Sequence, residues 1–409
     1  MNSETLFSMA LGLQSPWQVQ EITFAPNESG REELHLRIGF PPGSRFPDES
    51  GTPCPVHDTV ERHWQHLGFF EHACHLHCAV PRIKTPDGKV VTVVVPWARP
   101  GSGFTLLFEA LALALIEREM PVNRVAGLPR VNPQRIWTVF GHWVGKARAA
   151  GDPSSITRLG IDETSTRKGH HYVTLGVGLD QGRVIHATEG KGKETLGSIQ
   201  KHLEGKGVDQ SQIKQASLDL SPAFISGVKE FFPSAEVTFD RFHVVKLLNE
   251  AMDKVRKAER KENEALKGHK YTFLKNHENL SETKQQELAE MIRLYPALGE
   301  ACRLKVPFNG LWGMPDRPAA GAFLKQWCAE VGKAKIPAFM KFAKTAKAHW
   351  NGIVHFVESH LSNGILEGIN HKVQLAKRRA RGFRNIDNFI NMIHFLCGKL
   401  QFSYPRYFT

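Results

Sequence analysis

The chain has 409 residues, and its 53 Lys and Arg outnumber its 41 Asp and Glu, which gives a formal net charge of +12. This length predicts two or three domains with a sizeable core, and the basic balance favours a polyanionic partner. There is no membrane-length apolar run, no signal-peptide pattern and no even spacing of the six cysteines, so we expect a cytoplasmic protein without a disulfide framework.

Residues 1–100 are expected to form a β-rich, zinc-finger-like module for binding DNA, because Cys and His side chains crowd residues 54–78. Tetrahedral zinc needs four such ligands, usually supplied as two closely spaced pairs. Cys54 and His57 form one pair, and a second pair can be drawn from Cys74, His75, His77 and Cys78. The preferred zinc ligands are Cys54, His57, Cys74 and Cys78. The alternative is a finger that binds no metal and folds by packing apolar side chains, namely Trp64, Leu67, Phe69 and Phe70.

Residues 101–150 predict a helix-turn-helix region. Residues 104–119 are strongly apolar with helical periodicity, residues 120–127 begin a short second helix, and residues 133–144 form a third helix with Pro at its first position. Such an arrangement commonly presents a recognition helix to the major groove of DNA. The side chains expected to face DNA are Gln134, Arg135 and Thr138, and those expected in the core are Ile136, Val139 and Phe140. A plain helical linker is the alternative, because residues 128–130 replace the usual glycine-containing turn.

A Gly-Asp-Pro-Ser segment at residues 151–154 marks the start of a further domain. Five β-rich runs follow, at residues 155–162, 171–179, 183–188, 215–220 and 235–239. One helix is predicted over residues 194–205, and another begins at Pro222 with Ser221 as its N-cap. The order β-β-β-α-β-α-β is that of the ribonuclease H-like fold, an α/β fold with a mixed sheet.

Asp162 ends the first of these runs and Asp219 lies near the end of the fourth, and these two strands are neighbours in a ribonuclease H-like sheet. Taken singly, Asp162 or Asp219 is better explained as a cap or turn residue. A third acid, Glu367, would reach the same place if a later helix packs against the sheet. Three converging carboxylates repel one another strongly unless divalent cations are bound, so together they predict a two-cation site.

Residues 362–385 place Glu367 at the head of a very basic helix that begins at Gly364 with Asn363 as its N-cap. The side chains expected to face the core are Ile365, Ile369, Val373 and Ala376, and those expected on the opposite face are Glu367, His371, Gln374 and Arg378. A positive ridge suited to a phosphodiester backbone consists of Lys377, Arg378, Arg379, Arg381 and Arg384. A solvated basic helix, with one Glu favoured in its first turn by the helix dipole, is the alternative.

Four sequence blocks, in this order, resemble the ISL3 family of insertion-sequence transposases. They are GIDETS, SLDLSPAF, FDRFHVVKLLNEAMDKVR and SNGILEGINHKVQLAKRRARGFRN. The resemblance runs over almost the whole chain, and such a multi-block match is more specific than any single motif. It implies that Asp162, Asp219 and Glu367 are the DDE triad, holding Mg²⁺ or Mn²⁺. It also implies a ribonuclease H-like catalytic domain, residues 151–241 and 356–409, interrupted by a helical insertion over residues 242–355.

The insertion is also predicted by the sequence itself, through a stripe of apolar residues at helical spacing between residues 244 and 255. His243 lies just before this stripe, in a block shared with the resembled family, and is either a supporting residue near the scissile phosphate or a packed histidine. The family usually carries a zinc finger with two CxxC pairs. This chain has CPVH in place of the first pair and residues 84–88 in place of the second, which puts structural Zn²⁺ in doubt.

The resemblance implies a transposase that binds the terminal inverted repeats of its element, cuts DNA strands and transfers them to target DNA. Joining two ends to one target implies a homodimer or larger assembly on double-stranded DNA in the bacterial nucleoid. Two alternatives are a transposase-derived regulator that binds DNA without cutting it, and a ribonuclease H-like nuclease without strand transfer. The intact set of three acids speaks against the regulator, and the predicted modules for binding the element's ends speak against the nuclease.

Overall fold

A computed structural model describes residues 2–167, 169–361 and 364–403. Their contacts divide them into two compact units, one within Met1–Ala150, Arg378–Arg381 and Leu400–Thr409, and the other within Gly151–Lys377 and Gly382–Lys399. No helix in these described ranges is long and apolar enough to cross a membrane.

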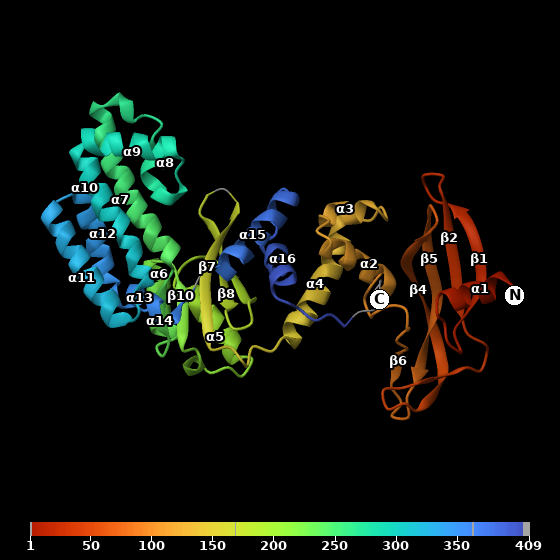
Figure 1. The fold of residues 1–409 in the computed structure, drawn as a ribbon. Helices are drawn as coiled ribbons and strands as arrows, with labels where there is room; N and C mark the ends of the chain where they lie inside the picture. The colour runs from red at the N-terminus through yellow and green to blue at the C-terminus, as the bar shows by residue number, and fades with distance from the viewer. Residues whose placement is uncertain (1, 168, 362–363, 404–409) are drawn as a thin grey trace. The chain divides into compact units, whose positions relative to one another are not determined.

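The first unit contains a six-stranded sheet in the order β1-β2-β5-β4-β3, with β6 paired to β5 (Figure 1). Its strands are β1 (Gln18–Pro26), β2 (Glu32–Gly39), β3 (Arg45–Pro47), β4 (Pro53–Phe69), β5 (His72–Lys84) and β6 (Val90–Thr92). The long β4–β5 hairpin dominates the sheet, and a short helix, α1 (Ser3–Ala10), precedes β1. Strand alternation sends Cys74, Leu76 and Cys78 into a core with Trp17 and Trp64.

Three helices complete the first unit, and they agree with the predicted helix-turn-helix region. They are α2 (Leu106–Glu117), α3 (Val122–Gly127) and α4 (Pro133–Ala150). Thr105 caps α2 by accepting the backbone N–H of Phe108, and Pro133 begins α4 where its missing N–H costs nothing. Ile136, Val139 and Phe140 are buried, as their spacing predicts.

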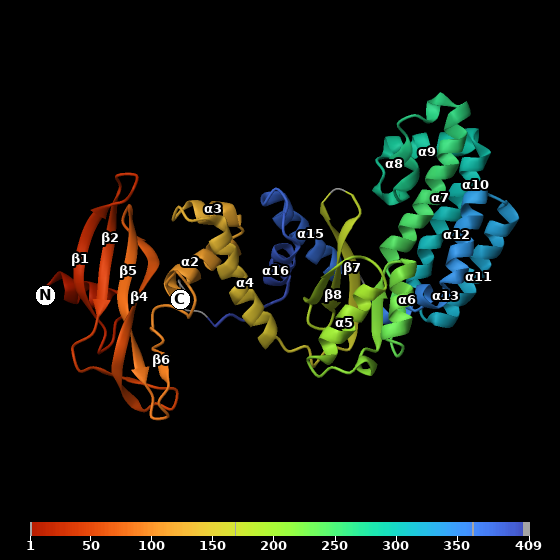
Figure 2. The ribbon, with the colours of Figure 1, turned by 180° about the vertical axis from the view of Figure 1, so that it is seen from behind.

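The second unit is built on a five-stranded mixed sheet in the order β11-β10-β7-β8-β9 (Figure 2). Its strands are β7 (Arg158–Arg167), β8 (His171–Gly178), β9 (Arg183–Glu189), β10 (Gln215–Leu218) and β11 (Glu236–Phe239), with helices α5 (Glu194–Glu204) and α6 (Pro222–Phe231) between them. Strands β7, β8 and β9 are antiparallel, whereas β10 is parallel to both β7 and β11. The order of elements and the pairing are consistent with a ribonuclease H-like fold.

Two further helices, α15 (Gly364–Arg379) and α16 (Ile386–Cys397), cover the face of this sheet opposite α5 and α6. Alternation along β7 divides the two cores. Leu159 and Ile161 pack with α5 and α6, whereas Gly160 faces Leu366 of α15. Helix α15 therefore lies against the side of β7 from which Asp162 projects.

The segment between β11 and α15 is helical. Its α-helices are α7 (Arg241–Glu262), α8 (Lys270–Leu274), α9 (Glu282–Leu294), α10 (Pro296–Phe308), α11 (Arg317–Ala334), α12 (Pro337–Ala348), α13 (Trp350–Val354) and α14 (Phe356–Ser359). The buried stripe of α7 contains Val244, Leu248, Ala251, Met252 and Val255. This stripe joins Phe308, Leu324 and Phe339 of the later helices in one core that is continuous with the sheet.

Several details of the second unit differ from the sequence predictions, among them Ala376 of α15, which was expected in the core and is only half-buried. Strand β7 continues to Arg167 instead of ending at Asp162, because pairing with β8 extends the hairpin beyond the acid. On α15, Leu366 is buried in place of the predicted Ile365, which is 39% exposed. The helix is rotated because Leu366 fills the space that Gly160 leaves open. The predicted N-cap, Asn363, lies outside the described residues.

Candidate active site

Asp162 and Asp219 lie on neighbouring parallel strands of the second unit. Ser217 of β10 pairs with Gly160 of β7, and each acid lies two residues further along its strand direction. Asp219 directly follows β10 and accepts the backbone N–H of Ser221 at 3.0 Å, in the turn that starts α6. The negative charge of Asp219 contributes to raising the pKa of Asp162, so the two carboxylates act on each other.

The half-buried side chain of Asp162 accepts two hydrogen bonds. The backbone N–H of Glu163 donates to its Oδ1 at 2.7 Å, and Asn370 Nδ2 donates to its Oδ2 at 2.6 Å. Burial raises the pKa of Asp162 to about 6, an effect that the Glu163 N–H bond and His243 oppose, and Asp219 and Glu163 add repulsion. A carboxylate held in this way is stabilised by a proton or by a cation.

His243 lies beside the two acids. Its Nδ1 is 2.9 Å from Oδ2 of Asp240, which is only 4% exposed and begins α7. This hydrogen bond raises the pKa of His243, and the charges of Asp240, Asp219 and Asp162 act in the same direction. The imidazole is therefore oriented by Asp240 and carries positive charge more readily than an ordinary histidine.

Glu367 has an exposed side chain in the first turn of α15. Over the described ranges, no three His, Cys, Asp or Glu side chains are grouped so as to hold a metal ion. The residue of α15 that contacts Asp162 is instead Asn370, three positions after Glu367 and on the same side of the helix. The structure thus brings Asp162 and Asp219 together and leaves Glu367 one helical turn away from the contact.

Two polar residues at this site, Glu163 and Asn370, were not predicted from the sequence, and two others, Gln374 and Lys377, were expected to face away from the protein core but contact β7. Glu163 is half-buried, and burial and Asp219 raise its pKa while Lys191 lowers it. Asn370, Gln374 and Lys377 line the flank of α15 that faces β7, where Gln374 donates to Thr164 Oγ1 at 2.7 Å. Asn370 lies three residues after Glu367 and four before Gln374, and this spacing is the signal that could have identified Asn370.

The oxygen-rich surroundings of Asp162 fit a hard divalent cation. Carboxylate and carboxamide oxygens are the ligands that Mg²⁺ and Mn²⁺ prefer. Asn370 Oδ1 is buried, and no hydrogen-bond partner for it occurs in the part of the chain that the structure describes. A cation beside Asp162 would offset both the carboxylate repulsion and the lack of a partner for this oxygen.

The proposed zinc ligands Cys54, His57, Cys74 and Cys78 are not brought together. Cys74 and Cys78 point into the sheet core, where burial raises the pKa of each thiol to about 12, whereas His57 is exposed. A thiol that resists ionisation is a poor zinc ligand. Cys54 is buried in the same core, but the hairpin pairs Val56 with Ile83 and His66 with Cys74, so Cys54 and Cys74 lie at opposite ends of the hairpin. The apolar packing alternative accounts for Trp64, which is in this core.

The three residues predicted to face DNA from α4 are all exposed, but they differ in their contacts. The Arg135 guanidinium lies over the Phe104 ring, 4.1 Å from its centroid, and donates to the Gly103 carbonyl at 3.3 Å. Thr138 Oγ1 donates to the Gln134 carbonyl at 3.0 Å, one turn back in the same helix. Arg135 is thus also a packing residue, which its sequence position did not reveal.

The basic ridge contains one residue that does not face solvent. Lys377 is half-buried, and its Nζ donates to the Ser165 carbonyl at 2.6 Å and to Ser165 Oγ at 3.1 Å, which fixes α15 to β7. The side chains of the remaining four are exposed, namely Arg378, Arg379, Arg381 and Arg384. The predicted ridge is therefore reduced to these four arginines, one of which, Arg379, also forms an ion pair with Glu119.

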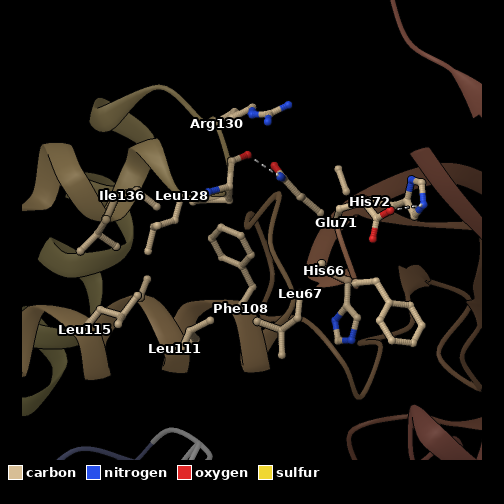
Figure 3. A pocket seen from close by; sticks show the side chains of 17 residues that line it. His66, Leu67, Glu71, His72, Phe108, Leu111, Leu115, Leu128, Arg130 and Ile136 are labelled. Carbon is tan, nitrogen blue, oxygen red and sulfur yellow. Dashed lines mark hydrogen bonds and ion pairs between the residues drawn. The ribbon is translucent and has the colours of Figure 1, made fainter. Parts of the chain in front are cut away.

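A cavity of about 270 Å³ lies within the first unit, between the end of the β4–β5 hairpin and the three helices (Figure 3). Its walls are mainly apolar, with Leu67 from β4 and Phe108 and Leu111 from α2. Gln65 Nε2 donates to the Pro129 carbonyl at 3.2 Å across one side. None of the predicted acids lines this cavity, so it is separate from the carboxylate site.

Comparison with known proteins gives two family matches. Residues 159–393 match a DDE-type ISL3 family described as transposase, and residues 93–144 match the helix-turn-helix domain of transposase family ISL3. The chain is 26% identical over 419 residues to the transposase for insertion sequence element IS1557 of Mycobacterium tuberculosis, covering 94% of this chain and 93% of that protein. It is 30% identical over 247 residues to the transposase for insertion sequence element IS1001 of Bordetella parapertussis, covering 58% and 60% of the two chains.

Proposed function

Because this chain belongs to the ISL3 family of insertion-sequence transposases, we propose that it cuts DNA at the terminal inverted repeats of its element and joins the freed ends to target DNA. The observation that carries this proposal is the pair of carboxylates, Asp162 and Asp219, on adjacent parallel strands beneath α15. DNA cleavage by this family is expected to depend on divalent cations. Carboxylates such as those of Asp162 and Asp219 are the groups that would hold these cations.

Asp162, Asp219 and Glu367 are the residues that would hold Mg²⁺ or Mn²⁺. When bound, two such ions supply activation of the attacking hydroxyl and neutralisation of the leaving oxygen in an in-line displacement. The chain itself keeps Asp162 in position through the Glu163 N–H and Asn370. Glu367 is proposed as the third acid, which is supported by its place one turn before Asn370, and its side chain is exposed.

His243 is proposed to support this site. Asp240 accepts its Nδ1–H and fixes the ring beside Asp162 and Asp219. A protonated imidazole there would reduce the repulsion between the acids and an approaching phosphate. The helical segment of residues 242–355, which begins next to His243, is proposed to be an insertion in a ribonuclease H-like catalytic domain.

DNA contacts are assigned to two surfaces of the chain. Gln134 and Thr138 on the exposed face of α4 would read the inverted repeats, and Arg135 would add a backbone contact. The second surface is the set of exposed arginines Arg378, Arg379, Arg381 and Arg384, which suit phosphates. Joining two ends to one target calls for a dimer or larger assembly on DNA, in the cytoplasm with the nucleoid.

The test uses labelled duplexes that carry the inverted repeats flanking the gene, with Mg²⁺ or Mn²⁺, and compares the wild type with Glu367→Gln. We expect nicking at the repeat tip and joining to a second duplex, both lost in Glu367→Gln while repeat binding persists. Binding without cleavage by either protein would favour the regulator. Cleavage without joining would favour the nuclease.

A further inference from the structure

The side chain of Asn370 on α15 makes a hydrogen bond to one of the acids of the site, Asp162. Its Nδ2 donates to Asp162 Oδ2 at 2.6 Å, although the two residues are 208 positions apart in the sequence. Its Oδ1 is buried and has no hydrogen-bond partner among the residues that the structure describes. The amide nitrogen of Asn370 therefore has a hydrogen-bond partner, and no partner is found for its oxygen among the described residues.

A buried carbonyl oxygen without a hydrogen-bond partner lowers the stability of the folded protein. On the same flank, Gln374 and Lys377 have no buried side-chain atom without a partner among the residues that the structure describes. Packing alone would be served by an apolar residue at position 370. The free oxygen beside Asp162 instead indicates a ligand with positive character.

The distance between the two side chains is suitable for a shared cation. Adjacent ligands of an octahedral ion with bonds of 2.0–2.1 Å are separated by roughly 2.9 Å. The carboxamide atom nearest Asp162 Oδ2 is 2.6 Å from it. A half-turn about the Cβ–Cγ bond of Asn370 exchanges its nitrogen and oxygen, which would bring Oδ1 next to a cation on Asp162.

We propose that Asn370 is a ligand of the divalent cation held by Asp162, contributing its carboxamide oxygen, an inference that rests on the proposed function. In the metal-free protein its NH₂ group donates to Asp162 and keeps that carboxylate in place. With a cation bound to Asp162, turning the carboxamide over would present its oxygen to the cation. Asn370 thus supplies a fourth protein ligand in addition to the three acids.

The test measures Mn²⁺ binding to the full chain without DNA, from the electron paramagnetic resonance signal of free Mn²⁺. Asn370→Ala is expected to weaken the affinity by about 10-fold or more, as loss of a group that supports a metal site usually does. Asn370→Asp keeps an oxygen of the same shape but loses the NH₂ donor, and it should bind Mn²⁺ at least as tightly as the wild type. Thermal unfolding of each variant checks that it is folded.

Gln374→Ala is the matched control, because Gln374 lies on the same flank of α15 and bonds only to Thr164 among the contacts found. It should leave Mn²⁺ binding unchanged. Wild-type affinity in Asn370→Ala, or equally weak binding in Asn370→Ala and Asn370→Asp, would overturn the ligand assignment. Asp162→Asn separates the two proposals: if it also binds Mn²⁺ like the wild type, the metal site of the proposed function fails as well.

Discussion

The indole of Trp143 on α4 donates its N–H to the carboxylate of Glu109 on α2 at 2.7 Å, and Glu109 is completely buried. Arg99 Nε and Ser102 Oγ donate to the same carboxylate at 3.0 and 2.5 Å. All three partners are donors, so the carboxylate links the helix-turn-helix region to the loop before it. A buried charge with this many hydrogen bonds is structural, since no face of it is left for DNA.

Replacing Glu109 by Gln should therefore destabilise the helices without touching the DNA-facing surface. In Glu109→Gln, an NH₂ group replaces one carboxylate oxygen and faces hydrogen-bond donors instead of accepting from them. We expect the stability of the region to fall by about 2–4 kcal/mol. The measurement is hydrogen exchange of peptides from α2 and α4 in the full chain. Glu117→Gln on the exposed side of α2 is the control and should leave exchange unchanged. Equal protection in the two variants would refute the structural role of Glu109.

Substitution of Arg135 by Ala and substitution of Gln134 by Ala are expected to have different effects. Arg135→Ala removes the guanidinium from the Phe104 ring and from the Gly103 carbonyl, and should cost about 1 kcal/mol in the stability of this region. Gln134→Ala should leave stability unchanged and weaken binding to the inverted repeat. Hydrogen exchange and titration with repeat DNA measure the two effects. Loss of stability in Gln134→Ala would contradict this division.

Gly160 permits the close approach of α15 to β7. A Cβ at this position would lie 2.8 Å from Leu179 Cδ2 and 3.0 Å from Leu366 Cδ2, both in the core. Gly160→Ala is expected to lower stability by about 1–3 kcal/mol and to loosen the helix that carries Glu367 and Asn370. Exchange of α15 amides is the readout.

Gly368 provides the contrasting case on α15 itself, because a Cβ there meets nothing within 4 Å. Gly368→Ala should stabilise the helix by up to about 1 kcal/mol, since Ala is the better helix former. If both substitutions changed stability in the same direction, the tight contact at Gly160 would not be what limits the packing of α15.

The raised pKa of Asp162 should make the stability of the protein depend on pH when no metal is bound. Its folded-state pKa is raised by burial from 3.8 to about 6, so between these values the folded state binds more protons than the unfolded state. Stability from this group is present below pH 4 and is lost as the pH rises through 6. The unfolding free energy of the wild type, minus that of Asp162→Asn, should fall by about 2 kcal/mol from pH 4 to pH 7.

Other carboxylates, such as Asp180 and Asp253, have lowered pKa values and change stability with pH in the opposite direction. Their contribution is the same in the wild type and in Asp162→Asn, so it cancels when the two unfolding free energies are subtracted. Urea unfolding in the presence of a chelator, at several pH values, provides the measurement. A difference that stays constant with pH would mean that Asp162 is not desolvated. Addition of Mn²⁺ at pH 7 should stabilise the wild type more than Asp162→Asn.

The sequence alone determined the features that depend on local pattern. Helical spacing predicted that Ile136, Val139 and Phe140 of α4 are buried, and the β-rich and helical segments predicted the order of elements along the second unit. The helix-turn-helix and transposase assignments are confirmed by the family matches. These features follow from periodicity and from turn residues, both of which are properties of short segments.

Only the tertiary structure decided which side chains meet. Cys74 and Cys78 looked like metal ligands by spacing, but the direction of the strand pleat buries them. Asn370, which no motif singled out, faces Asp162 because Leu366 packs into the space at Gly160 and sets the rotation of α15. Contacts between residues 208 positions apart depend on how two surfaces pack, and the spacing of residues along one segment carries no information about the other surface.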